Sequence, residues 1–187
     1  MLNYSNVIEN DKSYPGLQMR EIKPVMKLII RGKKRQFLSA VGKSLNLLLP
    51  NEANTSSRSD QLTALWLSPD EWMIVSNELA SKDTDKYNVY EVLFNSISKT
   101  NLGAVIDVTD QFVQLELKGK NIYEIFSAGC PFNFNEFKEK KGSTTQTVLN
   151  HIDVILQNKD ENIVNLFVRR SFAEHLWSWI EDCASRL

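Results

Sequence analysis

The sequence has few of the residues from which metal and cofactor sites are usually built. Cysteine occurs only at Cys130 and Cys183, and histidine only twice. Their spacing matches no CxxC or HExxH motif and no disulfide framework, so we expect both thiols to be reduced and packed as small apolar residues. The seven glycines form no GxGxxG, GxxxxGK[ST] or GxSxG turn. These absences disfavour dinucleotide-binding, P-loop and serine hydrolase functions.

An excess of charge of one sign is also lacking, as are long apolar runs. The net charge of −1 gives no basic excess that would attract nucleic acid. The longest apolar runs, such as residues 45–49 and 152–156, are far shorter than the ~20 residues of a spanning helix, and no signal peptide opens the sequence. We therefore expect a cytoplasmic protein that binds neither nucleic acid nor membrane. The hydrophobic content of 42% is ordinary for a folded core.

The clearest pattern lies in residues 107–134, DVTDQFVQLELKGKNIYEIFSAGCPFNF. Residues 112–118 alternate between apolar and polar, which predicts a half-buried strand with Gln114, Glu116 and Lys118 facing water. Residues 122–126 then repeat at helical spacing. Gly129, followed by Pro131, predicts that this short helix ends at a glycine in the left-handed conformation.

The first part of the chain predicts an arm, a strand and a helix. Residues 1–19 have the composition of a loose arm, and residues 25–31 of a strand. The helix that follows holds Phe37, Leu38 and Val41. Residues 45–49 predict a further short strand.

The middle of the chain predicts a hairpin, a helix and a strand. The hairpin covers residues 63–76 and places Trp66 nearly opposite Trp72. An amphipathic helix over residues 84–98 and a strand over residues 103–108 follow it.

The last part predicts a charged connection, a second hairpin and a closing helix. Residues 136–145 form the connection, and residues 148–156 and 163–168 form the two strands. Ser171 and Glu174 have the spacing of a capping box at the start of the helix. The element order predicts an α+β fold of two tandem ferredoxin-like (split β-α-β) halves, about 20–108 and 109–187.

Two groups of residues are candidate binding sites, and no catalytic, cofactor-binding or metal-binding residue is predicted. Lys33, Lys34 and Arg35 lie at a helix start, where backbone amides add to their charge, so they could hold phosphate or the polyglutamate tail of a folate. A solvated turn is the alternative.

Asp107 and Asp110 could handle a proton, or could accept hydrogen bonds from turn amides.

The second group is a candidate partner interface formed by Phe132, Phe134 and Trp179. Phe132 and Phe134 lie in a loop with three phenylalanines within a short span, and Trp179 lies at the edge of the apolar face of the closing helix. The alternative is that the phenylalanines close the core beneath their own loop.

Three segments together resemble the gamma subunit family of heterotetrameric sarcosine oxidase. They are WLSPDEWMIVS at 66–76, the segment 107–134, and RRSFAEHLWSWIEDC at 169–183. The resemblance covers residues 62–183. It implies the fold of the folate-binding domain of aminomethyltransferases, in one domain over residues 20–187.

The resemblance also implies a function. It is that of a non-catalytic subunit, with alpha, beta and delta partner subunits, in a complex that demethylates sarcosine and passes the one-carbon unit to tetrahydrofolate. FAD, FMN, NAD and tetrahydrofolate are then expected in other subunits. The folate-related iron-sulfur maintenance proteins carry KGCYxGQ where this chain reads SAGCPFNFNEF, which disfavours their function. The alternatives are a stand-alone folate-dependent aminomethyltransferase-like enzyme or folate-binding protein, and a scaffold subunit of another amine oxidase.

Overall fold

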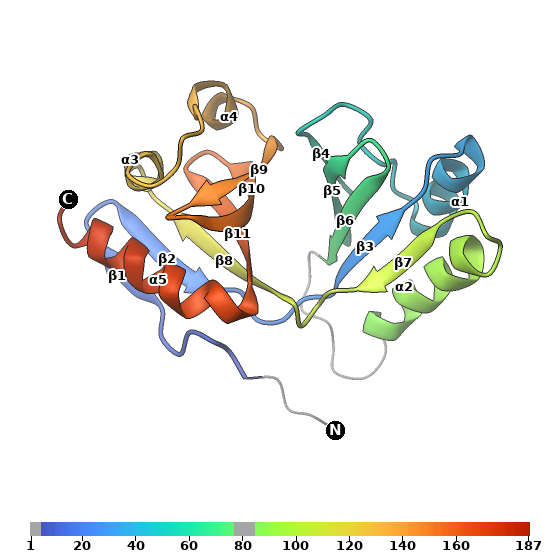
Figure 1. The fold of residues 1–187 in the computed structure, drawn as a ribbon, viewed down its shortest axis with the longest axis horizontal. Coiled ribbons are helices and arrows are strands. Elements are labelled where there is room, and N and C mark those ends of the chain that lie inside the picture. Colours follow the sequence, from blue (N-terminus) through green and yellow to red (C-terminus); the bar gives the residue numbers. More distant parts are fainter. Residues whose placement is uncertain (1–4, 77–84) are drawn as a thin grey trace. The chain divides into compact units, whose positions relative to one another are not determined.

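In the computed structural model, which describes residues 5–76 and 85–187, the chain folds into two compact units. Unit 2 is the continuous segment Val25–Thr109, whereas unit 1 combines Met1–Pro24 with Asp110–Leu187. Each unit contains one antiparallel sheet with helices packed on one of its faces (Figure 1). The predicted α+β class and its tandem halves are confirmed. The two units divide between Thr109 and Asp110, and unit 1 includes both ends of the chain.

Unit 2 has a five-stranded sheet in the order β4-β5-β6-β3-β7. Its strands are β3 (Lys27–Arg31), β4 (Ser56–Arg58), β5 (Leu62–Ser68), β6 (Glu71–Ser76) and β7 (Ala104–Asp107). The predicted hairpin is confirmed as β5 and β6, and Trp66 is the cross-strand partner of Trp72.

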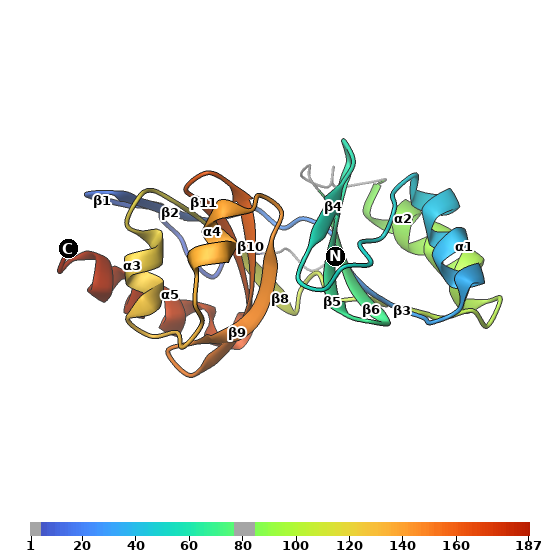
Figure 2. The same cartoon turned by 90° about the horizontal axis from the view of Figure 1, so that it is seen from above.

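The helices of unit 2 pack on one face of this sheet. They are α1 (Arg35–Leu45), α2 (Asp85–Leu93) and the π-helix η1 (Phe94–Ser98), which continues α2. Figure 2 shows α1 and α2 on the same side of the sheet. Their apolar side chains share a core with alternate residues of the strands, and the buried members include Leu28, Ile30, Phe37, Val41, Ile74, Leu93 and Ile97.

Two elements of unit 2 differ from the prediction. The strand predicted over residues 45–49 is wrong, because α1 continues to Leu45 and ends where Asn46 takes the left-handed conformation (φ 47°). The helix predicted over residues 84–98 is present as α2 and η1, while Thr84 lies outside the described residues.

Unit 1 has a six-stranded sheet in the order β1-β2-β8-β11-β10-β9. Its strands are β1 (Lys12–Tyr14), β2 (Leu17–Glu21), β8 (Phe112–Lys118), β9 (Thr144–Leu149), β10 (Ile152–Asp160) and β11 (Ile163–Arg169). The helices are α3 (Ile122–Ser127), α4 (Asn135–Glu139) and α5 (Arg170–Ala184). Residues of all three helices share one core with Val113, Leu115 and Leu117 of β8.

The loose arm predicted over residues 1–19 is wrong from residue 12 onward. Lys12–Tyr14 and Leu17–Glu21 form a hairpin that turns at Gly16 (φ 72°), and its second strand pairs with β8. Leu17 and Met19 are buried in the unit 1 core. Only these alternate positions are apolar, so the segment is stabilised by a strand almost 100 residues later in the chain rather than by a local pattern.

The run 148–156 is also not one strand. Asn150 (φ 49°) and His151 (φ 64°) are both left-handed and form the two-residue turn between β9 and β10. This is the backbone of a type I′ hairpin turn, whose usual sequence signal is Asn-Gly rather than Asn-His. The charged connection predicted over residues 136–145 is also partly regular structure, because it contains most of α4 and the start of β9.

The predicted ends of two helices are wrong in detail. α5 begins at Arg170, so Ser171 lies inside its first turn, and no side chain caps the helix at Arg169. Gly129 is not among the residues with positive φ. Glycine is required at this position for steric reasons instead, because a Cβ there would lie 2.7 Å from the Trp179 ring.

Candidate functional site

The strand β8 lies inside the unit 1 sheet and has two buried faces. Val113, Leu115 and Leu117 face the helices, as predicted. Gln114 and Glu116 point to the opposite face but are also buried, so the predicted water face is wrong at these two positions. The strand has neighbours on both sides, with Arg20 of β2 and Asn165 of β11 flanking Glu116.

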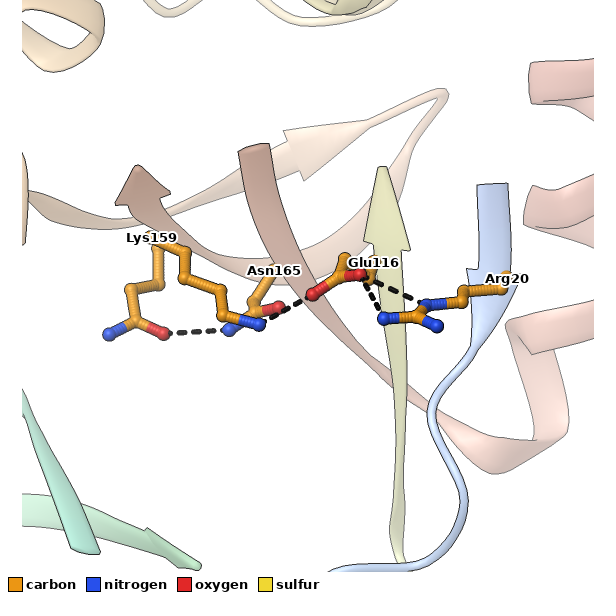
Figure 3. Close-up of polar contacts among 5 residues, drawn as sticks. Arg20, Glu116, Lys159 and Asn165 are labelled. Atoms are coloured by element: carbon orange, nitrogen blue, oxygen red, sulfur yellow. Dashed lines mark hydrogen bonds and ion pairs between the residues drawn. The ribbon is translucent and has the colours of Figure 1, made fainter. Parts of the chain in front are cut away.

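Glu116 is the centre of a charged network on this second face (Figure 3). Its side chain is only 9% exposed. Arg20 donates from Nε (3.0 Å) and Nη2 (2.6 Å) to Oε1, and Lys159 donates from Nζ (2.5 Å) to Oε2. One carboxylate from β8 is thus held by cations from β2 and β10, two strands that are not adjacent to each other.

The ionisation of Glu116 is set by two opposing effects. Burial alone would raise the pKa of this carboxyl, but the hydrogen bonds and charges of Lys159 and Arg20 outweigh burial and lower the pKa. The group is therefore a carboxylate at neutral pH. A carboxylate that already accepts three charged hydrogen bonds is a weak proton acceptor, so this arrangement suits charge recognition rather than general base catalysis.

Buried amides extend the network. Asn165 donates from Nδ2 to Oε1 of Gln157 at 3.0 Å. Oδ1 of Asn165 and Oε1 of Gln114 are buried and have no hydrogen-bond partner among the described residues. Sequence reasoning missed this set, because the partners of Glu116 lie 96 and 43 residues away from it.

The loop after Pro131 covers a cluster of aromatic rings. Phe134 is buried, and its ring centroid lies 5.0 Å from that of Phe132, 5.9 Å from that of Phe137 and 5.7 Å from that of Tyr123. Edge-to-face pairs of this kind add to the burial energy. The structure therefore corrects the placement of Phe134, which closes the core beneath its own loop.

Phe132 and Trp179 remain as the predicted partner contacts. Both are partly buried and pack against the unit 1 core. Trp179 lies against Gly129, so its ring is fixed on one side. Phe172, at the start of the same helix, is 48% exposed.

The basic turn after β3 is partly neutralised. Lys33 lies 3.6 Å from a carboxylate oxygen of Asp70, and Arg31 lies 3.8 Å from Asp70 and from Glu71. A hydrogen bond from Ser68, together with these cations, lowers the pKa of Asp70. Lys34 and Arg35 are exposed at the start of α1. An anion site at Lys33, Lys34 and Arg35 stays a prediction.

The remaining candidates have structural contacts. Asp107 accepts a hydrogen bond from the Thr109 amide at 2.9 Å, which is the turn role considered for it. Both cysteines are free thiols, as predicted, and Cys130 lies 3.4 Å from the Thr147 hydroxyl. In residues 5–76 and 85–187, no three His, Cys, Asp or Glu side chains are grouped to hold a metal ion.

A helix that crosses a membrane must be both long and apolar. None within the described ranges meets both conditions.

The family model described as "Sarcosine oxidase, gamma subunit family" matches residues 32–186. The chain belongs to this family. Two sarcosine oxidase gamma subunits, from Corynebacterium sp. strain P-1 and strain U-96, are 26% and 27% identical to it over 148 and 123 residues. These alignments span 79% and 65% of this chain, and 69% and 55% of the relatives.

Solved structures agree on the fold. A chain of the heterotetrameric sarcosine oxidase from Corynebacterium sp. U-96, in complex with pyrrole 2-carboxylate, matches with a TM-score of 0.82 at 21% identity. That match covers 94% of this chain and 87% of the other. The glycine cleavage system aminomethyltransferase T of Bartonella henselae matches with a TM-score of 0.63 at 14% identity, over 88% of this chain and 45% of that protein. The predicted aminomethyltransferase-like fold is confirmed.

Proposed function

We propose that this chain acts as the gamma subunit of a heterotetrameric sarcosine oxidase and supports the assembly of that enzyme. The observation that carries the proposal is the family match over residues 32–186. The fold similarity to a chain of the heterotetrameric Corynebacterium enzyme is consistent with it.

In this proposal the other subunits carry the chemistry. The alpha, beta and delta subunits hold FAD, FMN, NAD and tetrahydrofolate, and the complex demethylates sarcosine to glycine and passes the one-carbon unit to tetrahydrofolate. This chain contributes surface rather than reactive groups. The contacts of its buried carboxylate support that role, because Glu116 is engaged by Arg20 and Lys159 and is poorly suited to accept a proton.

Phe132 and Trp179 are the aromatic anchors that we propose for a subunit interface. Aromatic residues that are partly exposed on a rigid surface commonly carry much of the binding energy of an interface. Phe132 is held by edge-to-face contacts with Phe134 and Phe137, so little side-chain entropy would be lost when a partner covers it.

A second candidate function is binding of a folate, alone or as an aminomethyltransferase-like enzyme. The observation that favours it is the fold shared with aminomethyltransferase T. Equilibrium dialysis of the isolated chain with tetrahydrofolate distinguishes the two candidates. Stoichiometric binding would favour the second.

The proposal is tested by expressing the chain with the other subunits and purifying through a tag on this chain. We expect a complex with sarcosine oxidase activity, while the isolated chain carries neither flavin nor NAD. Failure to co-purify, or a stoichiometric flavin on the isolated chain, would overturn the proposal.

A pair of matched variants locates the interface. We expect Phe132→Ser to weaken association while the melting temperature of the isolated chain changes little. Phe134→Ser removes a buried ring and should instead lower the melting temperature. Equal association of Phe132→Ser and the unaltered chain would place the interface elsewhere.

A further inference from the structure

The second face of the unit 1 sheet carries more positive than negative charge around the Glu116 network. Lys118 lies two residues after Glu116 on β8, so its side chain points to the same face. It is exposed and is the cross-strand partner of Gln18 and Ile163. Arg20 and Lys159 contact the buried carboxylate of Glu116, and Lys118 lies two residues further along the same face, so one negative charge is opposed by three positive ones.

Nearby acids do not remove this excess. Asp160, at the end of β10, is paired with Lys141 at 2.7 Å. Glu161 follows in the turn between β10 and β11, and Lys120 follows Lys118 beyond the end of β8. Counting Glu116 and Glu161 against Arg20, Lys118, Lys120 and Lys159 still leaves two more basic than acidic residues in this part of the unit.

The cations of the network are held in place while they remain reachable from solvent. The side chains of Arg20 and Lys159 are 54% and 36% exposed, although both are fixed to Glu116. Arg20 binds Glu116 through Nε and Nη2, which leaves Nη1 to donate to another acceptor. A cation that is already ordered loses less side-chain entropy when it binds an anion.

We propose that Arg20, Lys118 and Lys159 form a docking surface for an acidic, extended segment of a neighbouring subunit. This inference rests on the proposed function as a subunit, and it adds the chemistry of one contact. Charge complementarity selects the partner, because three cations on one sheet face attract a segment rich in Asp and Glu and repel a basic one. Arginine is enriched in interfaces because its planar group binds carboxylates with defined geometry.

The test uses the complex of the other subunits, purified without this chain and titrated with the fluorescently labelled chain. Lys118→Glu reverses one exposed charge of the docking surface, and Lys138→Glu makes the same change on α4, outside it. We expect Lys118→Glu to raise the Kd roughly tenfold at low salt, and by less than about twofold near 0.5 M NaCl, where screening is strong. Lys138→Glu should change the Kd by less than about twofold at both salt concentrations.

Lys118→Gln provides a second variant that keeps the test valid if the charge reversal impairs folding, and circular dichroism checks all the variants. If Lys118→Glu and Lys118→Gln bind the complex with the same Kd as the unaltered chain and Lys138→Glu, the docking surface is overturned but the proposed function stands. If the unaltered chain itself does not bind, the proposed function fails, and this inference fails with it.

Discussion

The two units share an architecture but use the second face of the sheet differently. In unit 1 this face presents Gln114, Glu116 and Asn165, which are buried polar groups with directional contacts. In unit 2 the second face of the sheet presents Leu65 and Met73, which are buried and apolar, and one buried charge, Lys27, whose Nζ donates to the carbonyl oxygens of Val25 (3.2 Å) and Thr109 (3.5 Å). Apolar burial is non-directional, whereas buried charges stabilise only when their partners are placed correctly. Because the polar partners in unit 1 come from several strands, unit 1 depends on the register of its strands more than unit 2 does.

The largest expected effect tests whether the units are independent. Trp177→Ala empties a buried position in the unit 1 core and should lower the free energy of unfolding by about 3–5 kcal/mol. Hydrogen exchange should then show loss of protection in β8 but not in β3. Ser178→Ala, at the exposed neighbouring position, is the control. Equal loss of protection in both strands would show that the units unfold as one.

The next effect separates directional from non-directional stabilisation. Glu116→Gln removes the negative charge that Arg20 and Lys159 share, and should cost about 1.5–3 kcal/mol in urea unfolding, the range for hydrogen bonds to charged groups. Replacing all three residues by apolar ones (Arg20→Met, Glu116→Leu, Lys159→Met) should cost less than Glu116→Gln alone. The opposite order would mean that the charges themselves hold unit 1 together.

A glycine pair in unit 2 tests the packing of its apolar core. A Cβ at Gly103 would lie 2.2 Å from the Arg31 carbonyl oxygen and 2.7 Å from the Phe37 ring, so Gly103→Ala should cost about 1–3 kcal/mol. Gly42, inside α1, has its nearest such neighbour at 3.7 Å. Gly42→Ala should therefore stabilise the protein by about 0.5–1 kcal/mol, as judged by thermal unfolding. Similar losses at both positions would contradict this reading of the packing.

The smallest effect concerns acid stability. Ion pairing lowers the folded-state pKa of Glu116, so its contribution is present above the unfolded pKa of about 4.3 and is lost as pH falls through the folded pKa. Urea midpoints from neutral pH down to about pH 3 should therefore fall less steeply for Glu116→Gln than for the unaltered chain. Asp70→Asn, at the exposed ion pairs of unit 2, should change the slope less.

Local periodicity predicted the elements whose stabilising contacts are close in sequence. The β5–β6 hairpin and the short helix after β8 are of this kind, because alternation or helical spacing identifies the buried face within a few residues. Other elements depend on distant contacts. β2 has only three buried positions and pairs with β8, and the burial of Glu116 depends on Arg20 and Lys159. No pattern within one segment reports such partners.

Local chemistry of an uncommon kind explains further misses. His151 occupies a left-handed turn position that glycine usually fills, so the β9–β10 hairpin was not recognised. Ser171 matches a capping motif in sequence but lies one residue inside the helix. The candidate site was predicted only in part, because the partial exposure of Phe132 and the burial of Phe134 depend on how their loop folds back over Tyr123.

The interrupted path of the chain through unit 1 has a consequence during synthesis on the ribosome. Unit 2 is continuous and is complete in the growing chain before β8 is made. Glu116, the partner of Arg20, is made 96 residues later, which at about 5–20 residues per second takes roughly 5–20 s. Until β8 is made, β2 lacks the strand with which it pairs, and Leu17 and Met19 lack the core in which they are buried, so this early segment is prone to association with other chains.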